Sequence, residues 1–137
     1  MIEIRHLIGV PYLEGGFTLE GADCWGITLL ALQEFGVDLD DFAGKYFSGD
    51  ELGSIIASEK GASDWKLVEE PTPGTVVLMK SVGVEYFDHI GVYIGKDWVL
   101  HTHGMGSGSC INRLRSIDRA FKELEFYEHT TLNNNPS

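Results

Sequence analysis

The sequence predicts an α+β fold in which N-terminal helices pack on an antiparallel β-sheet. Apolar residues recur at helical spacing between Cys24 and Phe35, and Gly36 then ends the pattern. From Pro71 onward the pattern changes to short runs rich in β-branched and aromatic residues, which are typical of strands. Helices followed by strands, within 137 residues, predict one α+β domain.

The first predicted helix begins after Asp23, whose carboxylate can cap it, so Cys24 lies in its first turn. A second helix is expected after Ser48, because residues 48–51 match a capping box that precedes apolar residues at helical spacing. Strands are expected at residues 75–80, 87–94, 98–102, 110–114 and 124–127, with a short helix around 117–121.

The composition limits what the chain can bind. One folded domain is expected over residues 1–128, followed by a flexible polar tail over residues 129–137. Asp and Glu outnumber Lys and Arg by 21 to 10, and the net charge of -11 would repel nucleic acid. No apolar run reaches the roughly 18 residues of a membrane span, so membrane insertion is not expected. No signal peptide is evident, so we expect synthesis in the cytoplasm.

The two cysteines, Cys24 and Cys110, are too few for a disulfide framework and lack the spacing of a zinc site. A thiol attacks a carbonyl only as the thiolate, which the positive end of a helix dipole favours. Cys24 meets this condition, but the charge of Asp23 opposes it, so a resting thiolate needs a cation nearby. A buried apolar cysteine is the alternative explanation for either residue.

Histidine is the natural cation partner, and His89 opens a strand with a clear alternation. Ile90, Val92 and Ile94 would pack on one face, which leaves His89 on the other. Gly91 beside it leaves room for the close approach of a helix or a substrate. A strand-edge histidine bonded to its neighbours is the alternative explanation.

The turn after this strand decides which later histidine lies near the candidate base. A three-residue turn at residues 95–97 would set Ile94 opposite Trp98. In that register His103 lies directly opposite the candidate base, and His101 lies diagonally from it at about 7–8 Å. Both histidines could reach it, so the pattern alone does not choose between them.

Six motifs resemble, in order and spacing, those of the NlpC-type cell-wall cysteine peptidases, which are compact papain-like enzymes. The motifs are Gly9-Val10-Pro11-Tyr12, Gly15-Gly16, Asp23-Cys24-Trp25-Gly26, Pro73-Gly74-Thr75-Val76-Val77-Leu78, His89-Ile90-Gly91-Val92-Tyr93-Ile94-Gly95 and Val99-Leu100-His101. The resemblance extends from about Leu7 to His101. The order and spacing of the six motifs together are far more specific than any single motif.

The resemblance implies a papain-like fold and a role for each matching residue. The implied catalytic residues are Cys24 as nucleophile, His89 as base, His101 as the residue that orients His89, and Tyr12 as a hydroxyl beside the nucleophile. The implied substrate-binding residues are Asp23, Trp25 and Gly26. The implied reaction is hydrolysis of peptidoglycan stem peptides, typically between D-glutamate and the following diamino acid. It would use an imidazolium–thiolate pair and no metal or organic cofactor.

Trp25 departs from the serine that many family members have after the nucleophile, which predicts a differently shaped subsite beside the thiol. Single-domain forms with Asp-Cys-Trp-Gly resemble phage tail-associated peptidases, which would act from a virion tail at the host cell wall. Other tail proteins would then be partners. Two alternatives stay open: a non-catalytic tail assembly protein that keeps the fold, and an acyl or amide transferase on the same scaffold.

Overall fold

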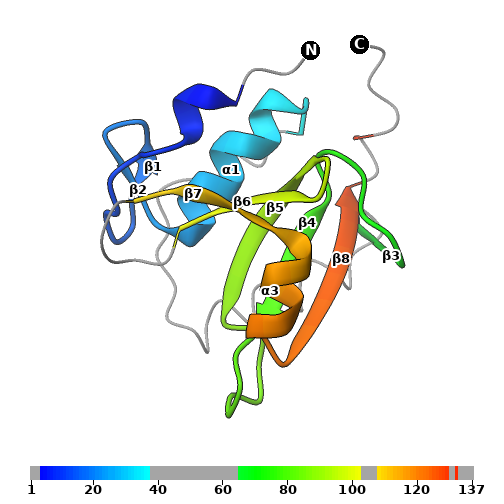
Figure 1. Ribbon diagram of the computed structural model, residues 1–137. Coiled ribbons are helices and arrows are strands. Elements are labelled where there is room, and N and C mark those ends of the chain that lie inside the picture. The colour runs from blue at the N-terminus through cyan, green and yellow to red at the C-terminus, as the bar shows by residue number, and fades with distance from the viewer. Residues whose placement is uncertain (1–3, 38–64, 103–107, 130–131, 133–137) are drawn as a thin grey trace.

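The computed structural model describes residues 4–37, 65–102, 108–129 and 132. Six strands form one antiparallel sheet in the order β3-β8-β4-β5-β6-β7. The strands are β3 (Trp65–Val68), β4 (Val76–Lys80), β5 (His89–Gly95), β6 (Trp98–His101), β7 (Cys110–Arg113) and β8 (Glu123–His129). Helices α1 (Cys24–Glu34) and α3 (Leu114–Ala120) pack against this sheet (Figure 1). The predicted α+β fold is confirmed.

Helix α1 packs on one face of the sheet and is buried on most of its sides. Its cap is the one expected, because the Asp23 carboxylate accepts a hydrogen bond from the Gly26 N–H. Phe35 is the C-cap, and Gly36 follows with a φ of 84° that suits glycine. The strand residues in the same core are Val76, Leu78, Ile90, Val92, Leu100 and Tyr127.

The second face of the sheet carries α3 and a smaller core. This core is formed by Val77, Met79, Val99 and Ile117, and Phe121 packs against it. Because side chains alternate along a strand, the two cores take alternate residues of β4 and β6. His89, the first residue of β5, pairs with Met79 and contacts Phe121. Ile90 and Val92, further along the strand, belong to the core beside α1.

A short N-terminal part packs along α1. It contains the 3-10 helix η1 (Arg5–Leu7) and the two-stranded pair β1 (Phe17–Thr18) and β2 (Gly21–Ala22). Ser109 ties this part to the sheet: its N–H donates to the Val10 carbonyl at 2.9 Å, and its hydroxyl accepts from the Val10 N–H at 2.9 Å. The segment that carries Tyr12 is thereby anchored to the beginning of β7.

Several predicted boundaries need correction. The short helix begins at Leu114 rather than near Ile117, and β8 continues to His129, one residue into the predicted tail. Strand β3 and the small β1–β2 pair were not predicted. The helix expected after Ser48 lies outside the described residues, and the division into one domain and a tail stays a prediction. In the described part of the chain, no helix is long and apolar enough to cross a membrane.

Candidate active site

Cys24 is the first residue of α1, as the sequence predicted. The carboxylate of Asp23 accepts the Gly26 N–H at 2.7 Å and the Gly15 N–H at 2.9 Å. One side chain therefore caps the helix and fixes the glycine-rich loop that precedes it. The hydroxyl of Thr28 donates to the Cys24 carbonyl at 2.8 Å, which supports the first turn.

The surroundings of Cys24 disfavour a resting thiolate. Burial raises the pKa of the Cys24 thiol to about 12, and the negative charge of Asp23 acts in the same direction. Backbone N–H groups of Trp25, Ile90 and Cys24 itself lower the pKa without reversing the shift. The expected imidazolium–thiolate pair is therefore corrected to a neutral thiol that must lose its proton during attack. The contact with Ile90 also places the sulfur beside β5, one residue from His89.

His89, His101 and Asn112 form a continuous hydrogen-bonded chain across three neighbouring strands. The Nε2 atom of His89 lies 2.9 Å from Nδ1 of His101. The Nε2 atom of His101 lies 2.7 Å from Oδ1 of Asn112. His101 is only 1% exposed, whereas His89 is partly exposed. The structure thus brings together the two histidines that the sequence paired, and adds a third residue.

In the hairpin between β5 and β6, the strands pair in the expected register away from the turn, but the turn itself differs. Val92 pairs with Leu100, as the expected register requires, so His101 lies diagonally from His89. The turn has two residues, Lys96 and Asp97, with φ of 53° and 70°, and Gly95 rather than Ile94 lies opposite Trp98. An irregularity between Tyr93 and Gly95 absorbs the extra residue. His103 lies outside the described residues.

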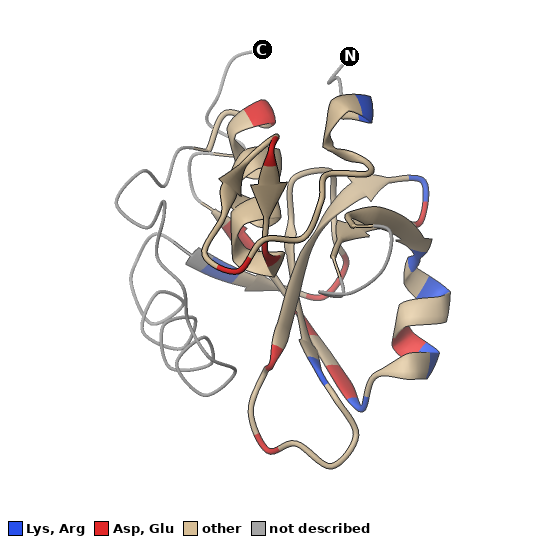
Figure 2. Cartoon of the chain, turned by 90° about the vertical axis from the view of Figure 1, so that its left-hand side faces the viewer, with Lys and Arg blue, Asp and Glu red and all other residues tan. Residues whose placement is uncertain are grey.

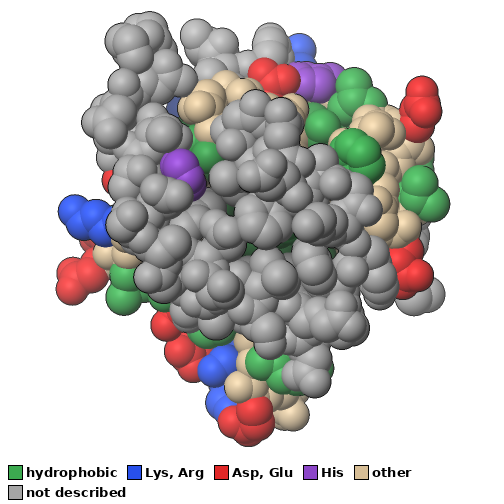
Figure 3. Space-filling view, turned by 180° about the vertical axis from the view of Figure 1, so that it is seen from behind, with side chains coloured by type: hydrophobic (Ala, Val, Ile, Leu, Met, Phe, Trp, Pro, Cys, Tyr) green, Lys and Arg blue, Asp and Glu red, His purple; other side chains and the backbone are tan. Residues whose placement is uncertain are grey.

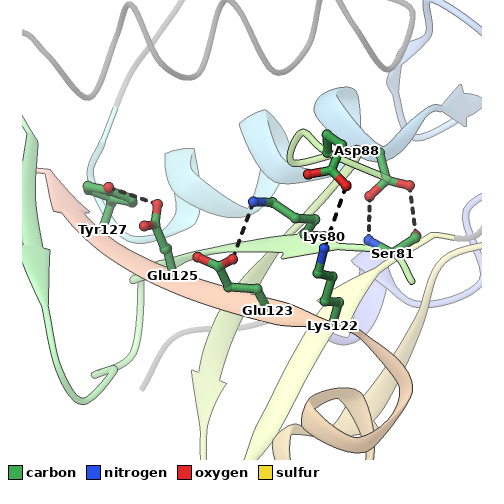
Figure 4. Close-up of polar contacts among 8 residues, drawn as sticks. Lys80, Ser81, Asp88, Lys122, Glu123, Glu125 and Tyr127 are labelled. Atoms are coloured by element: carbon green, nitrogen blue, oxygen red, sulfur yellow. Dashed lines mark hydrogen bonds and ion pairs between the residues drawn. The ribbon is translucent and has the colours of Figure 1, made fainter. Parts of the chain in front are cut away.

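Two neighbours hold His89 in place. The ring of Phe121, at the end of α3, stacks on the His89 ring at 5.9 Å with an interplanar angle of 7°. Asp88, the preceding residue, accepts the Ser81 N–H at 2.9 Å and the Ser81 hydroxyl at 2.7 Å (Figure 4). These bonds close the β4–β5 connection directly before His89 and fix the start of the strand.

Tyr12 lies near the thiol, as the resemblance implied. It pairs with Ala22 in a parallel bridge, two residues before Cys24. Partial burial raises the pKa of the Tyr12 hydroxyl, and the charges of Asp23, Cys24 and Glu14 raise it further. These electrostatic interactions place the hydroxyl among the same groups that surround the sulfur.

The three residues expected to bind substrate are buried instead. Asp23 is 4% exposed and Trp25 is 6% exposed. A Cβ at Gly26 would collide with the carbonyl oxygen of Gly16, so this glycine serves close packing. Asp23 thus caps the helix, and Trp25 and Gly26 are packed inside the protein, while a role of the three residues in binding substrate stays a prediction.

The surface beside this loop is apolar and exposed. Leu13 is 55% exposed, Phe17 41% and Leu19 51%. Figure 3 shows hydrophobic side chains exposed on the side of the molecule where β1 and β2 lie. These exposed apolar side chains lie in the loop that leads to Cys24.

Charge is unevenly distributed around the site. Figure 2 shows Lys and Arg residues, in blue, on and next to α3. The loop before α1 contributes the exposed carboxylates Glu14 and Glu20 as well as the buried Asp23. Within the described ranges, no group of three or more His, Cys, Asp or Glu is arranged to hold a metal ion.

Sequence reasoning missed Asn112 and Phe121. A single asparagine in a short strand has no motif that marks it. Only the pairing of β6 with β7, in which Val99 lies opposite Asn112, shows that Asn112 shares a face with His101. Phe121 was expected at the end of a short helix, but its contact with His89 depends on how α3 packs.

Comparison with known proteins places the chain in a family. The NlpC/P60 family model matches residues 9–121. Comparison with curated proteins finds no significant match.

The chain is similar to the NlpC/p60 domain of the peptidoglycan hydrolase SagA, with 22% identity, a TM-score of 0.54 and coverage of 87% of both chains. It is also similar to a protein described as similar to lipoprotein, of the NLP/P60 family, from Staphylococcus aureus subsp. aureus Mu50. There the identity is 17% and the TM-score 0.54, over 89% of this chain and 37% of that chain. Because the family model matches most of its length, the chain belongs to the NlpC/P60 family.

Proposed function

We propose that this protein is a cysteine peptidase that hydrolyses peptide bonds in peptidoglycan. The observation that carries the proposal is the position of the Cys24 thiol at the start of α1, where it contacts the backbone of Ile90. Ile90 directly follows His89, and His89 is hydrogen-bonded to His101. Family membership adds support, as does the similarity to a protein described as a peptidoglycan hydrolase.

The proposed reaction begins with attack by Cys24 on the scissile carbonyl while His89 takes the thiol proton. The high pKa of the thiol means that proton transfer and attack must be coupled. His89 then returns the proton to the leaving amine, and the sulfur keeps the acyl group as a thioester. Water, activated by the same imidazole, hydrolyses the thioester and restores the thiol.

The developing oxyanion needs hydrogen-bond donors near the sulfur. The backbone N–H of Cys24, at the start of the helix, and the hydroxyl of Tyr12 are proposed as these donors. Loss of one such donor typically costs about 3 kcal/mol of transition-state stabilisation.

The proposed bond is the one between D-glutamate and the diamino acid of the stem peptide. The exposed carboxylates Glu14 and Glu20 support this choice, because they would attract the free amino group of a diamino acid. A phage tail is proposed as the working location, with other tail proteins as partners. This location is supported by the Asp-Cys-Trp-Gly sequence at residues 23–26, which resembles that of phage tail-associated peptidases.

The deciding experiment is incubation with purified peptidoglycan followed by mass spectrometry of the released muropeptides. Wild type should release stem-peptide fragments with a new terminus at the D-glutamate, and Cys24→Ala should release none. Cys110→Ser is the matched control, because it removes the other thiol but keeps the donor to Asn112, and it should behave as wild type. Addition of an amine acceptor distinguishes hydrolysis from transfer, because a transferase would give amide products. Absence of any product with wild type would favour the non-catalytic alternative.

A further inference from the structure

The role of Asn112 follows from the donors and acceptors in its hydrogen bonds. An amide oxygen can only accept, so the bond between Asn112 Oδ1 and His101 Nε2 requires a proton on that nitrogen. In neutral His101 the other ring nitrogen, Nδ1, then has no proton and must accept. Its partner is Nε2 of His89, at 2.9 Å, which must therefore donate.

The chain of bonds thus determines which nitrogen of His89 is basic. With the proton on Nε2, neutral His89 has its lone pair on Nδ1. If the Asn112 amide were reversed, its NH₂ group would donate to His101, and each bond in the chain would reverse. His89 would then have its proton on Nδ1 and could not take a second proton there while neutral.

A second donor favours the stated orientation of the amide. The Cys110 thiol donates to the same Oδ1 atom at 3.5 Å, so two donors meet one acceptor. Burial raises the pKa of the Cys110 thiol, which keeps it protonated and able to donate. An NH₂ group at this position would face the Cys110 S–H, and the bond from that donor would be lost.

Strand β7 is held rigidly beside the β5–β6 hairpin, so Asn112 has a fixed position. The Leu114 N–H donates to the Asp97 carbonyl at 2.7 Å. The Arg113 guanidinium lies 4.0 Å from the centre of the Trp98 ring and donates to the Lys96 carbonyl at 3.2 Å. Both residues that follow Asn112 are therefore bonded to the turn of the hairpin.

We infer that Asn112 is a positioning residue whose carbonyl oxygen fixes the tautomer of His101 and, through it, makes Nδ1 of His89 the basic nitrogen. The assignment rests on the proposed function only for its last step, in which this nitrogen takes the proton of Cys24.

The test is nitrogen NMR of the full chain with ¹⁵N-labelled histidine, at about pH 8, where an ordinary imidazole is neutral. Both His89 and His101 should carry their proton on Nε2 in wild type. Asn112→Leu has similar volume and no acceptor, and it should give mixed tautomers at both histidines. Asn112→Asp keeps an acceptor and should restore the wild-type spectrum. Cys110→Ser, on the same strand, keeps a donor to the Asn112 oxygen, so it is the matched control and should leave both tautomers unchanged.

Kinetics provide the second measurement. Asn112→Leu should lose at least about tenfold in kcat with KM within about twofold, and Asn112→Asp should stay within about threefold of wild type. Two results overturn the inference: a wild-type His101 protonated on Nδ1, or unchanged tautomers in Asn112→Leu. The first needs no variant, so the test stands even if Asn112→Leu does not fold. If the tautomers shift as expected but wild type cleaves no peptidoglycan, the positioning role stands and the proposed function fails.

Discussion

His101 occupies the space that a side chain at Gly91 would need. A Cβ at position 91 would lie 3.0 Å from Cβ of His101 and 2.7 Å from the carbonyl oxygen of Leu100. Gly91→Ala should therefore push His101 away from His89, with a loss of about 1–3 kcal/mol in unfolding free energy. We also expect at least about a tenfold loss in kcat/KM, because His89 would lose its hydrogen-bond partner. Urea denaturation and muropeptide release measure the two effects.

Gly83→Ala is the matched control for this substitution. Gly83 has a φ of 85°, and a Cβ added there would meet nothing within 4 Å, so the substitution strains the backbone by about 1 kcal/mol without a clash. Its activity should equal that of wild type. Equal activity losses in the two variants would show that Gly91→Ala acts only through stability.

His101→Ala should lower kcat/KM at least about tenfold while the fold is retained, because His89 loses the partner that sets its tautomer. His103→Ala should cost less than about threefold. Circular dichroism establishes folding, and one peptidoglycan assay ranks both variants. The reverse ranking would transfer the orienting role to His103.

Alkylation of Cys24 by iodoacetamide should be slow at neutral pH. Because the pKa of the thiol is raised to about 12, the thiolate fraction rises about tenfold per pH unit up to about pH 11. The rate should follow this increase in a Cys110→Ala background, where Cys24 is the only thiol. A rate that is already constant between about pH 6 and 8 would instead reveal a resting ion pair. His89→Ala is the comparison, since it would abolish such an early plateau.

Asp23 should make the protein less stable as the pH rises. Burial raises the pKa of its carboxyl above 3.8, although bonds from the Gly26 and Gly15 N–H groups oppose the shift. The folded state therefore keeps a proton that the unfolded chain has lost. The unfolding free energy should fall as the pH increases from about 3.8 through the raised pKa.

Asp23→Asn lacks this titration, so its unfolding free energy should fall less over the same pH range. Urea denaturation at several pH values from about 4 to about 7 measures the difference. The exposed Asp118, on α3, provides the control substitution Asp118→Asn, which should keep the wild-type dependence. Parallel curves for wild type and Asp23→Asn would contradict the prediction.

Tyr12→Phe should fold normally and lose about tenfold or more in kcat, because one hydroxyl near the developing oxyanion is removed. Tyr86→Phe changes another exposed tyrosine, outside the proposed site, and should not affect turnover. The assay is release of soluble fragments at saturating substrate. Unchanged turnover in Tyr12→Phe would reduce Tyr12 to a structural residue.

Local patterns in the sequence were sufficient to predict much of the site. The cap at Asp23 and the β5–β6 register away from the turn depend on residues that are close in sequence, and both predictions agree with the structure. The irregularity near Ile94 was missed because a three-residue turn and a two-residue turn with an extra strand residue have the same length. Asn112 was missed because its contact depends on the pairing of β6 with β7. The burial of Trp25 was not predicted because α1 is covered on several sides, which a one-sided helix pattern does not reveal.

The position of β8 affects the time at which the protein can complete its fold during synthesis. β8 is the last described strand along the chain, yet it pairs with β3 on one side and β4 on the other. Until residues 123–129 leave the ribosome, the edge of β4 lacks its partner and the smaller core lacks Leu124 and Phe126. A growing chain can form α1 and the β5–β6 hairpin early, but the sheet closes only after β8 has been synthesised. Between the synthesis of β4 and that of β8, the nascent protein therefore exposes an open strand edge of the kind that chaperones protect.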